Sequence, residues 1–220
     1  MLPKVFLILI SHTIQMNILI HPTYFPTISH FIAMLKAETI LLEVEDNFQK
    51  QTYRNRMYIY SPNGKQMLNV PVSHTRKHPN QKYKDLQIDY SEKWQKIHFK
   101  SLEAAYRSSP FFEYFIDDLM PLFEKKHNFL LDYNLLTLEV LQDCLGIKLK
   151  TVETKEFVKE TTSDIIDYRY LANSKKTLHS FETYTQVFDH KHNFINDLTI
   201  LDLLFNEGRY AVEYLKRQDL

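Results

Sequence analysis

Near the start of the chain, the order of apolar and polar residues predicts a buried strand, an amphipathic helix and a second buried strand. Residues 18–20 are all apolar, which is typical of a strand inside a sheet. Apolar residues recur at helical spacing from Ile28 to Leu35, and residues 39–44 again read as a buried strand. A strand, a helix and a strand in this order form a βαβ unit, so the pattern predicts a parallel sheet.

Two further strands, expected at 54–60 and 65–72, are joined at Asn63 and Gly64. This pair favours the positive φ angles of a tight hairpin turn. The polar residues 73–87 predict an exposed loop. The chain therefore adds an antiparallel hairpin to the parallel unit.

Helical periodicity dominates the second half of the chain. The expected helix starts are Ser91, Ser109 with Pro110, Asn134, and Asn196 or Asp197, since these residue types favour helix N-termini. Pro121 is expected to end or kink the second of these helices, and Gly146 and Gly208 to end the third and fourth.

A short strand is expected at 148–152, followed by a loop-rich stretch at 153–183 with a short helix near Ser163. The predicted fold class is therefore α/β, with α+β as the alternative. It combines an N-terminal βαβ unit and a β-hairpin with a helical half packed on the sheet.

We expect residues 1–15 to be an N-terminal extension and residues 16–220 to form a single domain. The apolar run at 5–10 is far shorter than the ~20 residues that span a bilayer, and no small-residue cleavage site follows it. A weak signal or anchor, and an extra strand or arm, are the alternatives. The prediction is a cytoplasmic protein with no membrane span.

Composition excludes several classes of function. The 27 basic residues match the 27 acidic ones, which argues against a nucleic-acid partner, and three glycines are too few for a glycine-rich phosphate loop. Cys144 is the single cysteine, so an internal disulfide and a cysteine-rich zinc site are excluded. The pairs His74 with His78 and His190 with His192 lack a third ligand in sequence, and no metal site is predicted.

Several collinear segments resemble one protein family. They are YFP at 24–26, YRNR at 53–56, LNVPV at 68–72, IDYS at 88–91 with Trp94, SPFFEY at 109–114 and ILDLLFNEG at 200–208. This set is similar to the WbqC-like family, above all to its Bacteroidetes-type members. The resemblance implies work in surface-polysaccharide biosynthesis of the O-antigen type, on a nucleotide-sugar or a similar anionic ligand. It identifies no cofactor and no reaction. Many members have glutamine, serine or threonine where this chain has His21, and tyrosine where it has His30.

The first candidate site residues are basic. Arg54 and Arg56 are two apart on a predicted strand, so both side chains would share one face and could clamp an anionic group of the substrate. Asn55 would point to the opposite face and is assigned to substrate binding with them. His21 and Tyr24 follow the first strand and precede a helix N-terminus, where α/β proteins commonly bind anions, and are catalytic candidates.

Three more candidates lie on helices. Trp94 and His98 are four residues apart, so they touch the same surface and could line a sugar pocket, although core packing is the alternative. Asp202 lies among leucines, where it could act as a base or form a structural pair. Two hypotheses follow. An enzyme would bring Tyr24, Arg54, Arg56 and Trp94 to one pocket, whereas a non-catalytic binding or assembly protein would pair the arginines internally.

Overall fold

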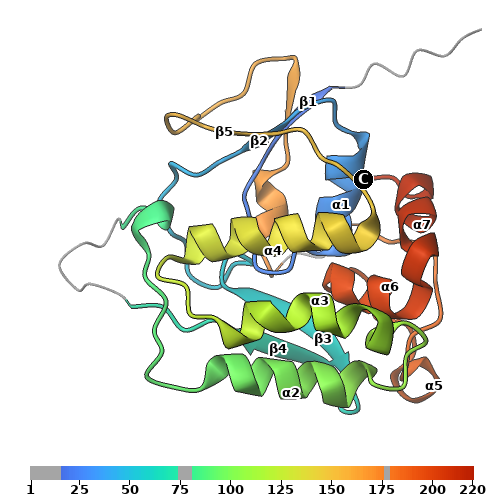
Figure 1. The fold of residues 1–220 in the computed structure, drawn as a ribbon. Helices are drawn as coiled ribbons and strands as arrows, with labels where there is room; N and C mark the ends of the chain where they lie inside the picture. The colour runs from blue at the N-terminus through green and yellow to red at the C-terminus, as the bar shows by residue number, and fades with distance from the viewer. Residues whose placement is uncertain (1–15, 74–80, 176–178) are drawn as a thin grey trace, which may run out of the picture.

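The computed structural model describes residues 16–73, 81–175 and 179–220 and has the predicted α/β fold (Figure 1). A four-stranded parallel sheet has the strand order β5-β2-β1-β6, and β3 and β4 form a separate hairpin. The strands are β1 (Asn17–Ile20), β2 (Ile40–Leu42), β3 (Arg56–Ser61), β4 (Gly64–Asn69), β5 (Thr151–Glu153) and β6 (Ile165–Asp167). The predicted extension at 1–15 and the pair His74 and His78 lie outside the described residues.

The βαβ unit is confirmed. Helix α1 (Ile28–Lys36) connects β1 to the parallel strand β2, with Ile18 opposite Ile40. β1 is a central strand because β2 and β6 pair with its two edges. Its apolar side chains are accordingly almost completely buried.

Strand β6 was not predicted. The expected short helix near Ser163 is wrong, and residues 165–167 instead extend the parallel sheet beside β1. The segment has three residues and leaves Ile166 at the sheet edge 38% exposed, so it carries no recognisable alternation of apolar and polar positions.

The hairpin at Asn63 and Gly64 is confirmed, and Gly64 has the positive φ of 92° that the turn requires. However, β3 begins at Arg56, so Arg54 precedes the strand. The prediction that Arg54 and Arg56 share one strand face is therefore wrong. Thr52 to Asn55 instead form a turn, and the backbone of Tyr53 in this turn bonds to Tyr24 after β1 and to Ala172 after β6.

Four helices lie where periodicity predicts them: α2 (Trp94–Tyr106), α3 (Phe112–Glu124), α4 (Leu130–Leu145) and α6 (Ile200–Glu207). Helix α7 (Ala211–Arg217) follows α6, and the short helix α5 (Asp189–His192) was not predicted. Gly146 and Gly208 follow α4 and α6, as predicted. Helix α3 continues through Pro121, which lies in its last turn.

All four predicted helix starts are wrong. Phe111, not Ser109, is the N-cap of α3. Lys93, not Ser91, is the N-cap of α2. Asn134 lies inside α4, where it is fully buried and donates to the Arg54 carbonyl oxygen at 2.7 Å. Asp197 precedes α6 but accepts from the Ser29 backbone N–H at 2.9 Å, at the start of α1. The side chains of Asn134 and Asp197 thus make tertiary hydrogen bonds and do not cap the helices that their positions in the sequence predicted.

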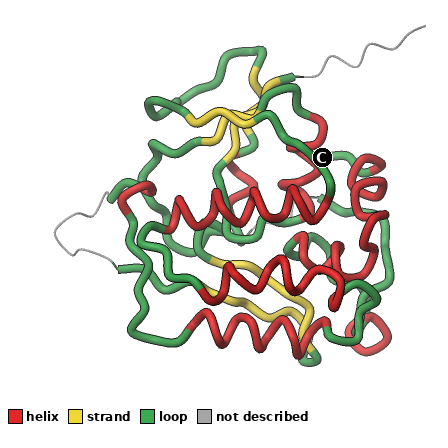
Figure 2. The backbone as a smooth tube through the Cα atoms, viewed as in Figure 1, coloured by secondary structure: helices red, strands yellow, loops and turns green. Residues whose placement is uncertain are grey.

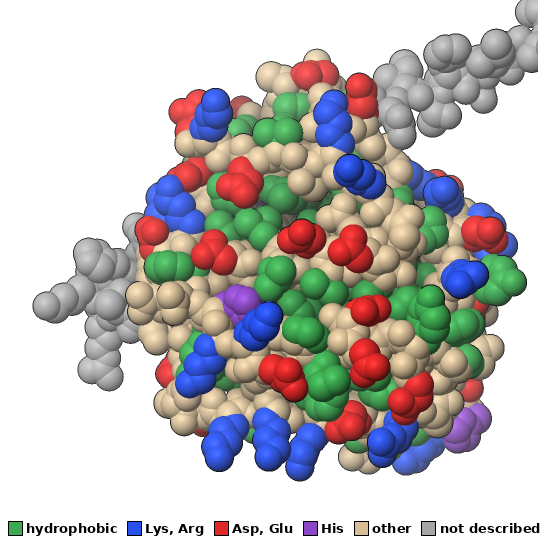
Figure 3. Space-filling view, in the orientation of Figure 1, with side chains coloured by type: hydrophobic (Ala, Val, Ile, Leu, Met, Phe, Trp, Pro, Cys, Tyr) green, Lys and Arg blue, Asp and Glu red, His purple; other side chains and the backbone are tan. Residues whose placement is uncertain are grey.

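The parallel sheet lies at the top of the view and the hairpin in its lower half, with α4 between them; α3 overlaps the hairpin in this view and α2 lies below it (Figures 1 and 2). On the face shown in Figure 3, Lys and Arg side chains are interspersed with Asp and Glu side chains. Several of the Lys and Arg side chains gather along the lower edge, near α2. Among the described residues, no helix is both long and apolar enough to span a membrane.

Candidate functional site

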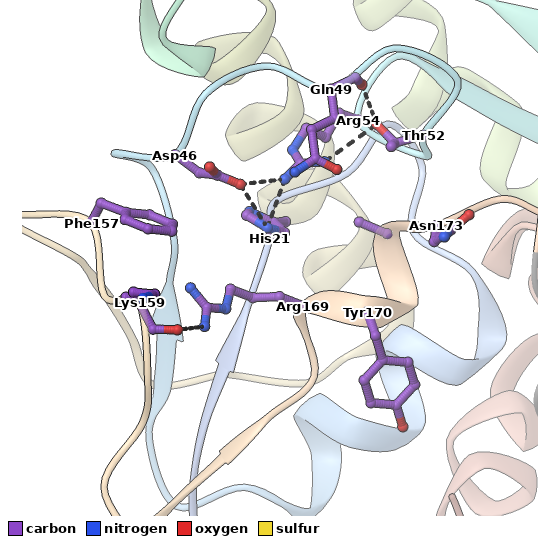
Figure 4. Close-up of a pocket in the computed structure, with 11 residues that line it drawn as sticks. His21, Asp46, Gln49, Thr52, Arg54, Phe157, Lys159, Arg169, Tyr170 and Asn173 are labelled. Carbon is purple, nitrogen blue, oxygen red and sulfur yellow. Dashed lines mark hydrogen bonds and ion pairs between the residues drawn. The ribbon is translucent and has the colours of Figure 1, made fainter. Parts of the chain in front are cut away.

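The strand order places a crevice beside β1. The chain runs from β1 to β2 and β5 on one side and returns to β6 on the other, so β1 and β6 flank a topological switch point. Open α/β sheets bind ligands at the carboxyl ends of strands at such a point. A pocket of about 290 Å³ opens there (Figure 4). It is lined by His21, Asp46, Gln49, Thr52, Arg54, Phe157, Lys159, Arg169, Tyr170, Ala172 and Asn173.

Arg54 forms the buried base of the pocket and is only 1% exposed. Its Nη2 donates to Nε2 of His21 at 2.7 Å and to Oδ2 of Asp46 at 2.9 Å. Nη1 lies 3.4 Å from Oγ1 of Thr52 (Figure 4). The guanidinium is thus held in one orientation by groups that follow β1 and β2.

The contacts fix the tautomer of His21. A guanidinium can only donate, so Nε2 of His21 must accept, and Nδ1 carries the proton toward the Glu43 carbonyl oxygen at 3.3 Å. Burial, followed by the charge of Arg54, holds the pKa of His21 well below its usual value. His21 is therefore a neutral acceptor that orients Arg54.

Arg169 follows β6 and brings a second guanidinium to the pocket. Its Nε and Nη2 both bond to the Asp167 carboxylate, at 3.0 and 2.6 Å, and Nη1 lies 3.7 Å from Oε2 of Glu43. The hydrogen bonds that Arg169 donates to Asp167 are the main cause that raises the pKa of Arg169. Both arginines are thus held in the protein by carboxylates.

The fully buried Glu43 links β2 to the segment that borders the pocket mouth. Its Oε1 accepts from Thr154 at 3.0 Å, and its Oε2 accepts from the Val158 N–H at 3.2 Å. Arg169 also donates to the carbonyl oxygens of Val158 and Lys159. These bonds place the exposed side chains of Phe157 and Lys159 at the mouth.

Tyr24, Trp94 and His98 form a separate cluster. Tyr24 is completely buried, and its hydroxyl lies 2.9 Å from Nδ1 of His98. The Trp94 and His98 rings contact each other at 5.1 Å between centroids, as their spacing predicted. Burial raises the pKa of Tyr24 well above its usual value and lowers that of His98 to about 4. None of the three lines the switch-point pocket.

Asp202 also lies elsewhere, with no exposed surface. Its Oδ2 accepts from the Tyr184 hydroxyl at 2.5 Å and from Nε2 of Gln186 at 2.9 Å. Burial raises its pKa to about 6. The three catalytic candidates His21, Tyr24 and Asp202 therefore lie in three different surroundings.

The expected arginine clamp is not formed. Arg54 lines the switch-point pocket, whereas Arg56 and Asn55 line another one. Of the sequence-based candidates, only His21 and Arg54 come together in the first pocket.

Sequence analysis missed two residues of this pocket that carry charge at its base. Asp46 closely follows a predicted strand, and this position was the signal that could have found it. Arg169 follows β6, and no signal was available once that strand was read as loop. No group of three or more His, Cys, Asp or Glu side chains suited to a metal ion occurs in the described ranges.

The protein is thus an α/β protein with a parallel sheet, and it has a positively charged pocket at the topological switch point of that sheet. Its residues 21–179 match the WbqC-like protein family, and the chain belongs to that family. Every residue that lines the pocket lies within the matched segment, whereas Asp202 lies outside it.

One relative is the uncharacterized protein Rv1507c of Mycobacterium tuberculosis strain H37Rv. The two sequences are 24% identical over 224 aligned positions, which cover 90% of this chain and 96% of the relative. No solved structure matches the chain.

Proposed function

We propose that this protein is an enzyme or accessory factor of surface-polysaccharide biosynthesis that binds an anionic activated sugar, such as a nucleotide-sugar, in the switch-point pocket. The main support is the charge of the lining, where Arg54, Lys159 and Arg169 stand against the carboxylate of Asp46. Phosphate groups are bound in proteins by guanidinium and ammonium groups of this kind.

The site residues would divide their roles. Arg54 and Arg169 supply positive charge at fixed positions, since His21, Asp46 and Asp167 orient them. Lys159 lies at the exposed mouth and would close onto the ligand. His21 would position Arg54, because its Nε2 lone pair is already in use.

The substrate class is supported by membership of the WbqC-like family, since the resemblance to that family implies work in surface-polysaccharide biosynthesis of the O-antigen type. The expected cytoplasmic location would also suit a nucleotide-sugar ligand. A pocket of about 290 Å³ is at the small end for such ligands and fits a diphosphate with part of a sugar.

Titration calorimetry with UDP-N-acetylglucosamine, UDP, pyrophosphate and uridine tests the proposal. The three phosphate-bearing compounds should bind and uridine should not. Lys159→Gln should weaken binding about tenfold, because a charge-assisted contact is lost. Lys155→Gln is the matched control, since Lys155 is exposed in the same segment but does not line the pocket.

A non-catalytic binding or assembly protein is the second candidate. The internal pairing of Arg54 with His21 and Asp46, and of Arg169 with Asp167, favours it, because these guanidiniums have structural partners without any ligand. Absence of binding by UDP-N-acetylglucosamine, UDP and pyrophosphate would support this candidate and overturn the first.

A further inference from the structure

A second pocket, of about 350 Å³, lies at the base of the hairpin. Asn55, Arg56 and Asn69 contribute to it from the two strands and the turn before them, and Lys50 and Gln51 border it. Arg56 stands opposite Asn69 in the hairpin register. None of these residues lines the switch-point pocket.

Asn55 has a buried acceptor that faces no donor. The residue is 6% exposed, and its Nδ2 donates to Oδ1 of Asn69 at 2.9 Å and to the Val70 carbonyl oxygen at 3.0 Å. Both of these oxygen atoms accept hydrogen bonds, so the group of Asn55 that faces them must be its NH₂ group, and the orientation of the Asn55 amide is fixed. Its Oδ1 is therefore left buried without a hydrogen-bond partner among the described residues.

Arg56 has the complementary property. Its Nε is buried without an acceptor, and the described part of the chain provides its guanidinium with no hydrogen bond or ion pair. Buried polar atoms in folded proteins nearly always have a partner. The same pocket thus offers an unpaired cationic donor and an unpaired neutral acceptor, with the Lys50 side chain at its border.

We propose that this pocket binds a small oxyanion that carries a hydroxyl or amino group next to its charge. The oxyanion would accept from Arg56, with Lys50 adding a second positive charge. The neighbouring hydroxyl or amino group would donate to Oδ1 of Asn55, which a simple anion cannot satisfy. The proposal is independent of the ligand in the switch-point pocket.

The test uses full-length, isotope-labelled protein and nuclear magnetic resonance titrations. L-lactate represents a hydroxycarboxylate and glycerol 3-phosphate a hydroxyphosphate, while propanoate lacks the hydroxyl group. We expect one of the first two probes to shift the Arg56 Nε–H and Asn55 amide signals, and propanoate to bind several-fold more weakly. The better probe identifies whether the oxyanion is a carboxylate or a phosphate.

Arg56→Gln should weaken binding of that probe about tenfold through loss of charge-assisted contacts. It should fold, because Arg56 has no partner to lose. Arg209→Gln is the control, since Arg209 is exposed and does not line the pocket. If Arg56→Gln does not fold, Lys50→Gln replaces it, and its binding should fall severalfold.

Three results would overturn the proposal: no shift with either hydroxylated probe, binding of propanoate as tight as that of the better hydroxylated probe, or unchanged affinity in the folded variant. UDP binding by Arg56→Gln should remain as in the wild type, because that measurement reports only on the switch-point pocket. The proposals for the two pockets can therefore be contradicted independently of each other.

Discussion

Nη2 of Arg54 lies 2.7 Å from Nε2 of His21, so a side chain from the turn before the hairpin is held by the residue that directly follows the central strand. Asp46 approaches the same guanidinium nitrogen at 2.9 Å. The pocket base is therefore a three-residue network in which each member depends on the other two.

Replacing Arg54 with methionine should be strongly destabilising. The change leaves the Asp46 carboxylate and the His21 acceptor without their donor, and breaking a buried pair costs about 3–5 kcal/mol. Chemical denaturation of Arg54→Met measures the loss. Arg209→Met, at an exposed position, should change the free energy of unfolding by less than about 0.5 kcal/mol. Equal stability of the two variants would show that the network contributes little.

Asp202 should make stability depend on pH. Burial raises its pKa from 3.8 to about 6, so the folded state binds more protons than the unfolded state between these values. Stability is therefore lost as the pH rises through this window. Asp202→Asn cannot titrate and should gain about 3 kcal/mol relative to the wild type between pH 4 and pH 7.

Denaturation of both proteins at several pH values measures this difference. The exposed Asp117→Asn is the control and should follow the wild type at each pH. A constant gap between Asp202→Asn and the wild type would mean that the carboxyl group titrates normally.

Two glycine substitutions should differ in cost. At Gly64, with φ of 92°, a new Cβ would meet nothing closer than the His192 ring at 3.9 Å, so Gly64→Ala should cost only the backbone strain, about 1 kcal/mol. At Gly208, the Cβ would lie 2.6 Å from the Phe111 ring. Gly208→Ala should therefore lower the melting temperature clearly more than Gly64→Ala, and the reverse order would contradict the packing argument.

A protein that begins at Met16 should keep its stability. The first buried strand starts one residue later, so the expected change in melting temperature is about 1 °C or less, well under the shift for 1 kcal/mol. Differential scanning calorimetry of both chains measures it. A clear drop, or insoluble protein, would show that residues 1–15 pack on the domain.

Local sequence patterns were sufficient to predict those secondary-structure elements that a single continuous stretch of sequence determines. Strand β1, helix α1 and the turn at Gly64 follow from hydrophobic spacing and from glycine geometry. Asn134 and Asp197 were misread because their preference for helix caps is a local rule, whereas the fold uses them for contacts 80 and 168 residues away.

The site was less predictable for a related reason. His21 could be placed because it follows a strand that the sequence shows clearly. Arg169 follows a three-residue strand whose pairing with β1 is visible only in the folded chain. Arg54 and Arg56 are neighbours in sequence, but the start of β3 between them sends their side chains to different pockets.

The start of α1 is completed by residues near the other end of the chain. Asp197 holds the Ser29 N–H, the Leu198 carbonyl oxygen accepts from Ile28, and Thr199 pairs with Thr27. During synthesis on a ribosome, which proceeds from the N-terminus, these partners are made long after the helix that needs them. The contacts that complete the start of α1 must therefore wait for the late residues, and a fragment limited to the family-matched segment 21–179 would lack them.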